Sequence, residues 1–452
     1  MSFVTVLIAL SLCQIAWILL GALWVVRKRD EIPLLISTLL FYVFTFRFWA
    51  LLQGWATPVD ISNFGFDPVD SNSALDVHVI AIMGETVLLS VYMWAQRRRI
   101  DLPHTLASPE LLDWLKPRVV GLGVICILIS LWARRSVGIQ VASGKSMSFE
   151  VSSYLSLFSL SLVGIAILIA TLWKSRAFHP GGESFLASLL FVAIVYLTFQ
   201  PVMRFQFLGW FVAVTIILSS GQSVVRRAQV LAIGLVGAVA LFAVAGALRN
   251  DEDPTVELQQ SAWERFAFAQ DANMLDGFVL LRQVYPRLLG YSYGGEHLEI
   301  FERPIPRRWW PDKPVGGYMN KLGIITADTG FTLGISPSLF GSFYQEGGLV
   351  GVVLCSIIYG FGFGRLVSFS TRIVPLAGLL IRGILAAAIV PLLRGGDLPG
   401  IYAWFGMSFW PCLLLLWLRR HEFFARMPYQ QQFAADVPAR MERDRRSEHS
   451  LV

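Results

Sequence analysis

The clearest deficit in this sequence is charge. Asp, Glu, Lys and Arg make up only 15% of its 452 residues, whereas 55% are hydrophobic, and the mean hydropathy is +0.60. A soluble domain carries about 25% charged residues. The apolar residues fall into runs of roughly 20, which is the length needed to cross about 30 Å of hydrocarbon at 1.5 Å per residue. The composition therefore excludes an ordinary soluble protein and predicts an integral membrane protein.

Several familiar sequence patterns are also missing. There is no Walker A loop and no HExxH, CxxC or GxSxG sequence, so soluble-type nucleotide or metal chemistry has no support, and we expect no metal ion and no cofactor. The four cysteines lie in apolar runs, which predicts packing rather than disulfides. The run Phe3–Val26 lacks a basic start and a small-residue cleavage site, so it is predicted to be a membrane span and not a signal peptide.

What the sequence does contain is a series of apolar runs, which predict an all-α bundle of about eleven transmembrane helices. The expected helices cover residues 3–26, 32–52, 75–95, 118–133, 152–173, 184–200, 207–220, 228–248, 346–367, 376–393 and 399–418. The glycine-rich run Gly360–Gly364 lies inside one of them and indicates close helix packing. We therefore divide the chain into N-terminal transmembrane helices (1–248), a large loop (249–336), C-terminal transmembrane helices (337–418) and a polar tail (419–452).

The positive charges predict the orientation. Basic clusters occur in alternate loops, at residues 27–29, 97–99, 116–118, 174–176, 226–227 and 419–420. By the positive-inside rule these loops are cytoplasmic. The N-terminus and the large loop are then expected outside the cytoplasm, and the tail inside. The tail is rich in charge and is expected to be poorly ordered.

The large loop combines a helical pattern with an irregular segment. Apolar residues recur at helical spacing around Phe278, and glycine and proline residues follow, so we expect two short amphipathic helices and then irregular chain over the membrane. From Arg249 to Ser336 the loop holds nine Lys and Arg against twelve Asp and Glu, a formal net charge of −3. It is therefore no electrostatic funnel as a whole. Its cations concentrate in Arg303–Lys313, a segment that could bind phosphate and stack a sugar ring or could lie in the headgroup zone.

Ionisable side chains near membrane depth are costly to place and mark candidate sites. Arg47 lies fairly deep, and three further arginines lie at the outer ends of predicted helices, namely Arg204, Arg249 and Arg394. They could snorkel to the interface or line an outward-facing pocket for an anion such as a diphosphate. Glu85, near the middle of its helix, is expected to pair with Arg47 rather than to relay protons. Arg382 is expected to be buried towards the cytoplasmic side.

Three short segments carry a family resemblance: Ile305–Pro314 (IPRRWWPDKP), Ile335–Ser342 (ISPSLFGS) and Glu346-Gly347-Gly348. They resemble the Wzy-type oligosaccharide repeat-unit polymerases, which include the O-antigen and enterobacterial common antigen polymerases. The resemblance implies a GT-C-like, metal-independent glycosyltransferase in the bacterial inner membrane, with its large loop in the periplasm. Its reaction would polymerise undecaprenyl-diphosphate-linked repeat units into a surface polysaccharide, an O-antigen or an exopolysaccharide.

The resemblance also implies roles for single residues. The three outer arginines match family arginines and would stabilise the charge that develops on the diphosphate leaving group. Part of the loop would bind substrate, namely Arg307, Arg308, Trp309, Trp310 and Lys313, and the loop would close as a lid over the arginines. A general base would draw the proton from the acceptor hydroxyl, and the candidates are Asp397, Glu346, Asp271 and His297. Asp397 could instead be a structural partner of Arg394, and Glu346 stands where some relatives are apolar.

The expected partners follow from this reaction. They are the lipid-linked oligosaccharide, the bacterial inner membrane, and a chain-length regulator and a flippase of the same pathway; no nucleic acid is expected. Two alternatives stay open. An O-antigen ligase-like transferase would use the same donor but deliver the glycan to the lipid A core, and a polysaccharide transporter or flippase is less favoured because the sequence shows no internal repeat.

Overall fold

The computed structural model describes residues 3–59, 61–103, 105–142, 149–199, 204–248, 273–302, 305, 309–310, 317–323 and 335–425. Every regular element named in these ranges is a helix, so the predicted all-α class is confirmed for the described chain. Nine of the described helices are long and apolar enough to cross a membrane, and two shorter apolar helices accompany them, Gly182–Thr198 and Phe207–Ser219. The protein is therefore a multi-pass α-helical membrane protein.

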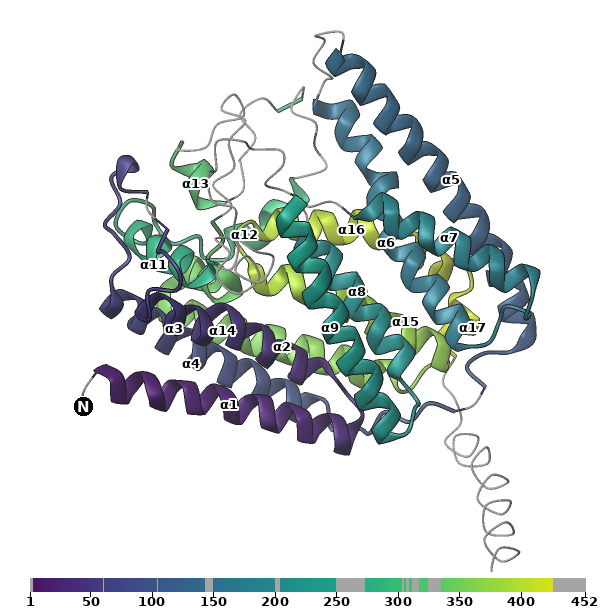
Figure 1. The fold of residues 1–452 in the computed structure, drawn as a ribbon, viewed down its shortest axis with the longest axis horizontal. Helices are drawn as coiled ribbons and strands as arrows, with labels where there is room; N and C mark the ends of the chain where they lie inside the picture. The colour runs from purple at the N-terminus through teal and green to yellow at the C-terminus, as the bar shows by residue number, and fades with distance from the viewer. Residues whose placement is uncertain are drawn as a thin grey trace, which may run out of the picture.

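The bundle (Figure 1) is built from α1 (Phe3–Lys28), α2 (Ile32–Leu40) continued by η1 (Phe41–Phe46) and α3 (Arg47–Leu52), α4 (Ser71–Ala95), α5 (Pro109–Ala142), α6 (Phe149–Lys174), α7 (Gly182–Thr198), α8 (Arg204–Ser219), α9 (Val224–Leu248), α14 (Ser338–Ser370), α15 (Pro375–Arg394) and α16 (Leu398–Leu418). Short elements join them: η2 (Ser62–Phe64), α11 (Met274–Val284), α12 (Gly295–Leu298), η5 (Glu299–Phe301), α13 (Tyr318–Lys321) and α17 (Arg420–Phe423). Each predicted apolar run thus coincides with a helical segment. In Figure 1, α11 to α13 lie at the end of the bundle away from α17.

The helix α14 differs most informatively from its prediction. It begins at Ser338, eight residues before the expected start at 346, and Gly347 and Gly348 inside it leave the helical region of backbone angles. Gly348 has a φ of +64°, and a Cβ there would lie 2.8 Å from the hydroxyl of Tyr291, so glycine is required at this position. Two glycines interrupt the apolar periodicity, which explains why the sequence did not reveal the first turns of α14.

The core lies along α15 and α14. Of an apolar 18-residue stretch of α15, 89% is buried inside the protein, whereas the corresponding share for α1 is 11%. α15 is therefore a central helix and α1 a peripheral one. α14 packs against α4, α15 against α8 and α16 against α6. A Cβ at Gly360 would lie 2.4 Å from the carbonyl oxygen of Leu88, and one at Gly364 would lie 2.6 Å from that of Tyr92. The backbones of α14 and α4 therefore touch, and the predicted close packing is confirmed.

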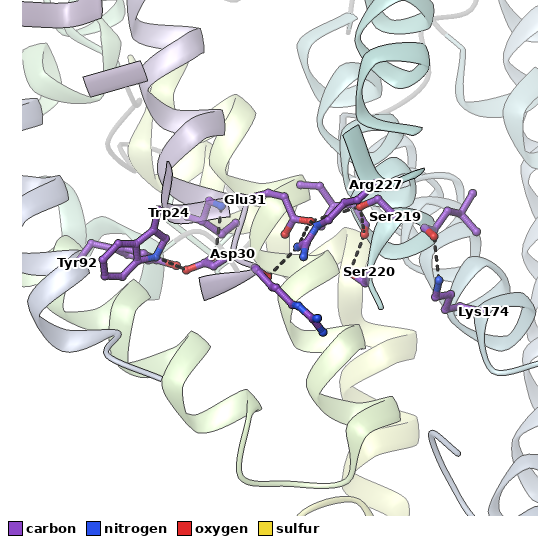
Figure 2. A network of polar contacts seen from close by, with 12 residues as sticks. Trp24, Asp30, Glu31, Tyr92, Lys174, Ser219, Ser220 and Arg227 are labelled. Carbon is purple, nitrogen blue, oxygen red and sulfur yellow. Dashed lines mark hydrogen bonds and ion pairs between the residues drawn. The ribbon is translucent and has the colours of Figure 1, made fainter. Parts of the chain in front are cut away.

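At one end of the bundle, several predicted cytoplasmic loops come together and share the network of polar contacts in Figure 2. Arg227 of α9 donates from Nε to Oε1 of Glu31 at 2.7 Å, and both side chains are buried. Asp30 accepts a hydrogen bond from the hydroxyl of Tyr92 at 2.7 Å. Arg382 is buried and interacts with the same charges, as predicted for its depth. These polar contacts connect segments from distant parts of the chain.

Asp30 generates a prediction about pH. Burial raises its pKa from 3.8 to about 6, while the hydrogen bond from Tyr92 opposes the rise. Between about pH 4 and 6 the Asp30 carboxyl holds a proton in the folded protein but has lost it in the unfolded chain. The free energy of unfolding therefore falls by up to about 3 kcal/mol as pH rises through this window. Above the window Asp30 causes no further change in the free energy of unfolding. Thermal unfolding in detergent across this range should show the fall in the wild type and not in Asp30→Asn. The exposed Asp101 supplies the control, Asp101→Asn, and a D30N profile parallel to the wild type would contradict this account.

Candidate functional site

The described part of the large loop packs into the bundle at the end opposite to the network of Figure 2. α11 contacts α4, α14 and η1. All its residues except Arg282 and Gln283 are buried, so α11 is a core helix and not the amphipathic helix predicted. A helix that is covered on nearly all sides by other helices cannot lift away without opening the core. The predicted lid therefore does not include α11.

Arg47 joins α11 to the first hairpin of the bundle. Its Nη2 lies 2.7 Å from Oδ2 of Asp276, and both side chains are buried. The predicted pairing of Arg47 with Glu85 is wrong, because Glu85 accepts a 2.5 Å hydrogen bond from Gln14 instead. Arg47 and Glu85 do not pair because they lie at different levels along the bundle. Thr45 of η1 bonds to His78 of α4 at 3.0 Å, which places Glu85 seven residues, or about 10 Å, further along α4.

Two of the predicted arginines stand on helix ends that lie at the same level. Gly209 of α8 packs against Ala387 of α15, with a Cβ position 2.4 Å from that carbonyl oxygen, and Gly383 packs against Ile217. The helices therefore run antiparallel, and the start of α8 is level with the end of α15. At these ends stand Arg204, the first residue of α8, and Arg394, the last residue of α15.

The end of α9 returns to the same level. Gly234 of α9 packs against Thr215 of α8, and Gly237 packs against Phe211, so the two helices form an antiparallel hairpin and α9 ends at Leu248 near the start of α8. Arg249 follows directly in the sequence. It lies outside the described residues, as do Asp271, Arg307, Arg308, Lys313 and the side chain of Arg204. The structure thus brings the ends of α8 and α15, which carry Arg204 and Arg394, to the same level as the end of α9.

The turn after Arg394 is held by backbone contacts to α14. Gly395 and Gly396 have φ angles of +68° and +105°, in the region that favours glycine. Gly395 forms a parallel bridge with Ser338, and a Cβ on Gly395 would lie 2.1 Å from the carbonyl oxygen of Ser338. The amide of Gly396 donates to Oγ of Ser342 at 3.1 Å. The serine-rich motif at the start of α14 and the arginine-bearing turn therefore form one unit.

Three further predicted residues have distinct surroundings. Asp397 caps α16, because its Oδ1 accepts a hydrogen bond from the amide of Gly400 at 3.0 Å, and this contact gives it a structural role. In the loop, the side chain of Trp309 is 78% exposed, and Trp310 is half-buried. The aromatic ring of Trp309 is therefore accessible from outside the protein.

Glu346 of α14 and His297 of α12 form an acid–imidazole pair beside the face of α14 that carries Ser338 and Ser342. Oε1 of Glu346 lies 2.6 Å from Nδ1 of His297 in α12, and Oε2 accepts the amide of Gly294 at 2.5 Å. The Glu346 side chain is 4% exposed, whereas that of His297 is 28% exposed. Ser338, Ser342 and Glu346 are spaced by four residues, so they share one helix face. That face spans about 12 Å from the arginine turn to the pair.

Two tyrosines that the sequence did not single out complete the pair. Nε2 of His297 lies 2.9 Å from the hydroxyl of Tyr359 in α14, and that hydroxyl bonds to the hydroxyl of Tyr402 in α16. Both tyrosines sit in apolar runs, where an aromatic residue is usually packing, so no local signal distinguished them. Beside the pair, burial raises the pKa of Glu296 above its usual value, and the ion pair with Lys321 opposes the rise.

The arrangement combines two chemical capacities. A guanidinium at the end of α15 can bind the oxygens of a phosphate or diphosphate. An imidazole oriented by a carboxylate can take and return a proton near neutral pH. Comparisons of the chain with models of protein families, with curated proteins and with solved structures found no match. The function must therefore be inferred from the residues of the site and from the sequence motifs.

The Gly395 bridge generates a prediction about stability. Gly395→Ala should destabilise the protein by about 1–3 kcal/mol, because the new Cβ would meet Ser338 and the residue would be held at a positive φ. Gly406→Ala in α16 is the matched control, since a Cβ there meets nothing within 4 Å. Thermal unfolding in detergent compares the two variants. Equal melting temperatures would show that the bridge does not hold the arginine turn.

Proposed function

We propose that this protein is a Wzy-type glycosyltransferase that polymerises lipid-diphosphate-linked oligosaccharide repeat units into a surface polysaccharide, an O-antigen or an exopolysaccharide. The reaction takes place at the outer face of the bacterial inner membrane, with the large loop in the periplasm. One observation supports this most directly: the arginine-bearing turn and the Glu346–His297 pair lie on one face of α14. The motifs at 305–314 and 335–342 point to the same family.

In the proposed reaction the acceptor sugar hydroxyl attacks the anomeric carbon of the growing chain, and the bond from that carbon to the diphosphate breaks. The electron pair leaves with the diphosphate, whose charge Arg394 stabilises together with Arg204 and Arg249. Fixed charges of this kind are often the largest catalytic contribution. His297 is the base that is protonated in the reaction, and the Glu346 carboxylate stabilises the imidazolium. The reaction class needs no bound metal in this scheme.

The loop supplies the substrate contacts in this proposal. The exposed face of Trp309 suits the apolar face of a sugar ring, and the segment around it contributes Arg307, Arg308, Trp310 and Lys313. The partners are the lipid-linked oligosaccharide, the inner membrane, and a chain-length regulator and a flippase of the same pathway.

The purified protein tests this function directly. In vesicles with a lipid-diphosphate repeat unit and EDTA, we expect a ladder of polymer lengths on a gel. A ladder that forms only after a divalent metal is added would show that the transfer needs a metal. Transfer of preformed glycan to a lipid A core acceptor, without any ladder, would identify an O-antigen ligase-like enzyme instead.

The arginines generate a second prediction for the same assay. Arg394→Ala and Arg249→Ala should each abolish polymer while the protein still inserts in the membrane, because the diphosphate charge loses a fixed cation. Arg118→Ala, an exposed position in a predicted cytoplasmic segment, is the control and should give normal ladders. Normal chain lengths in both R394A and R249A would overturn the role of the arginines.

The Glu346–His297 pair generates a third prediction for the same assay. His297→Asn should lower kcat by about 10²–10⁴-fold with little change in KM, because the general base is lost. Glu346→Gln should also lower kcat, since the imidazolium loses its countercharge. The exposed Glu110→Gln is the matched control. Initial rates at saturating substrate measure the effect, and wild-type kcat in H297N would exclude His297 as the base.

A further inference from the structure

With Glu346 ionised and His297 neutral, the hydrogen bonds around His297 can run in only one direction. An ionised carboxylate can only accept hydrogen bonds. One oxygen of Glu346 therefore accepts from the amide of Gly294, and the other accepts from Nδ1 of His297. A neutral imidazole that donates from Nδ1 can only accept at Nε2, which assigns Tyr359 as the donor to it. Tyr359 has a single proton, so its oxygen must accept from Tyr402. Both ring nitrogens of His297 are thus occupied.

Tyr402 is therefore the open end of the chain of bonds. Within the described residues the hydroxyl of Tyr402 bonds to Tyr359 alone. Its oxygen can therefore still accept a hydrogen bond from another group. Tyr402 is half-buried and belongs to α16, which packs against α12, the helix of His297. It lies four residues after Leu398, about 6 Å along α16 from its start. The turn at that start carries Arg394.

We propose that the hydroxyl of Tyr402 is the group that receives the proton of the acceptor sugar, and that Tyr359 passes a proton on to His297. This inference rests on the proposed function. As the acceptor oxygen bonds to the anomeric carbon, its proton moves to Tyr402, the proton of Tyr402 moves to Tyr359, and that of Tyr359 moves to Nε2 of His297. The products are the new glycosidic bond, the free lipid diphosphate and an imidazolium paired with Glu346. Neither tyrosine changes its net charge.

The relay places proton removal next to the diphosphate site. His297 is held by Glu346, about 12 Å along α14 from Ser338 and the arginine turn. Tyr402 lies about one turn into α16, the helix that follows the arginine turn. The two tyrosines therefore extend the chain of hydrogen bonds from His297 to the helix that begins at the arginine turn.

Phenylalanine variants test the relay in the vesicle assay. Tyr402→Phe and Tyr359→Phe should each lower kcat by about 10²–10³-fold with KM nearly unchanged, and the double variant should be no slower than either, because the residues act as a unit. Tyr196→Phe is the matched control, since Tyr196 is 76% exposed on α7. Thermal unfolding confirms that each variant is folded. If Y402F does not fold, Y359F provides the same test.

The pH profile separates a relay from a packing role. In the wild type kcat/KM should rise with pH because the relay needs an unprotonated proton acceptor, whereas the residual rate of Y402F should lack this rise because it no longer uses His297. A slow Y402F that keeps the rise, or one with wild-type kcat, would overturn the relay. In either case a polymer ladder from the wild type would leave the proposed function intact. A wild type that forms no ladder would overturn both.

Discussion

The contact between Ser338 and Gly395 is the constraint on which the end of the bundle opposite to the network of Figure 2 depends. In hydrocarbon, every backbone amide and carbonyl must be satisfied within the protein, so non-helical chain is tolerated only where other segments cover it. The turn between α15 and α16 meets this requirement by lying directly on the first turn of α14. Both glycines have positive φ angles, and Gly395 must also lack a Cβ for the backbones to approach. The guanidinium of Arg394 is consequently attached to a rigid joint between three helices.

Breaks in helices, and not the helices themselves, create the site. The kink at Gly347-Gly348 follows Glu346 immediately and makes room for Tyr291. The backbone beyond Tyr291 then reaches α14, where Tyr293 donates its amide to the Glu346 carbonyl at 3.0 Å. This contact brings α12 and its histidine to the carboxylate. A regular α14 would leave no space for Tyr291 at Gly348 and no free carbonyl on Glu346 for Tyr293. The kink is therefore needed to form the Glu346–His297 pair.

The sequence predicted the helices well because apolar length and spacing are local properties. It also predicted the packing of Gly360 and the common level of the helix ends that carry Arg204 and Arg394, since topology follows from alternating loops. Partners could not be predicted in the same way. Arg47 was assigned to Glu85 because that carboxylate was the nearest in an adjacent span, whereas its actual partner lies in the large loop. The tyrosines of α14 and α16 were missed because their significance depends on a histidine from α12, which no periodicity reveals.

The separation of Arg47 from Asp276 has a consequence for how the protein is made. The two residues are 229 positions apart, and synthesis proceeds at about 5–20 residues per second. Arg47 therefore enters the membrane roughly 10–45 seconds before its partner has been synthesised. An unpaired arginine at membrane depth costs about 2.5 kcal/mol or more, so the nascent first hairpin must stay near the interface, or be sheltered by the insertion machinery, until α11 arrives. Docking of α11 onto Arg47 therefore comes after the insertion of the first hairpin.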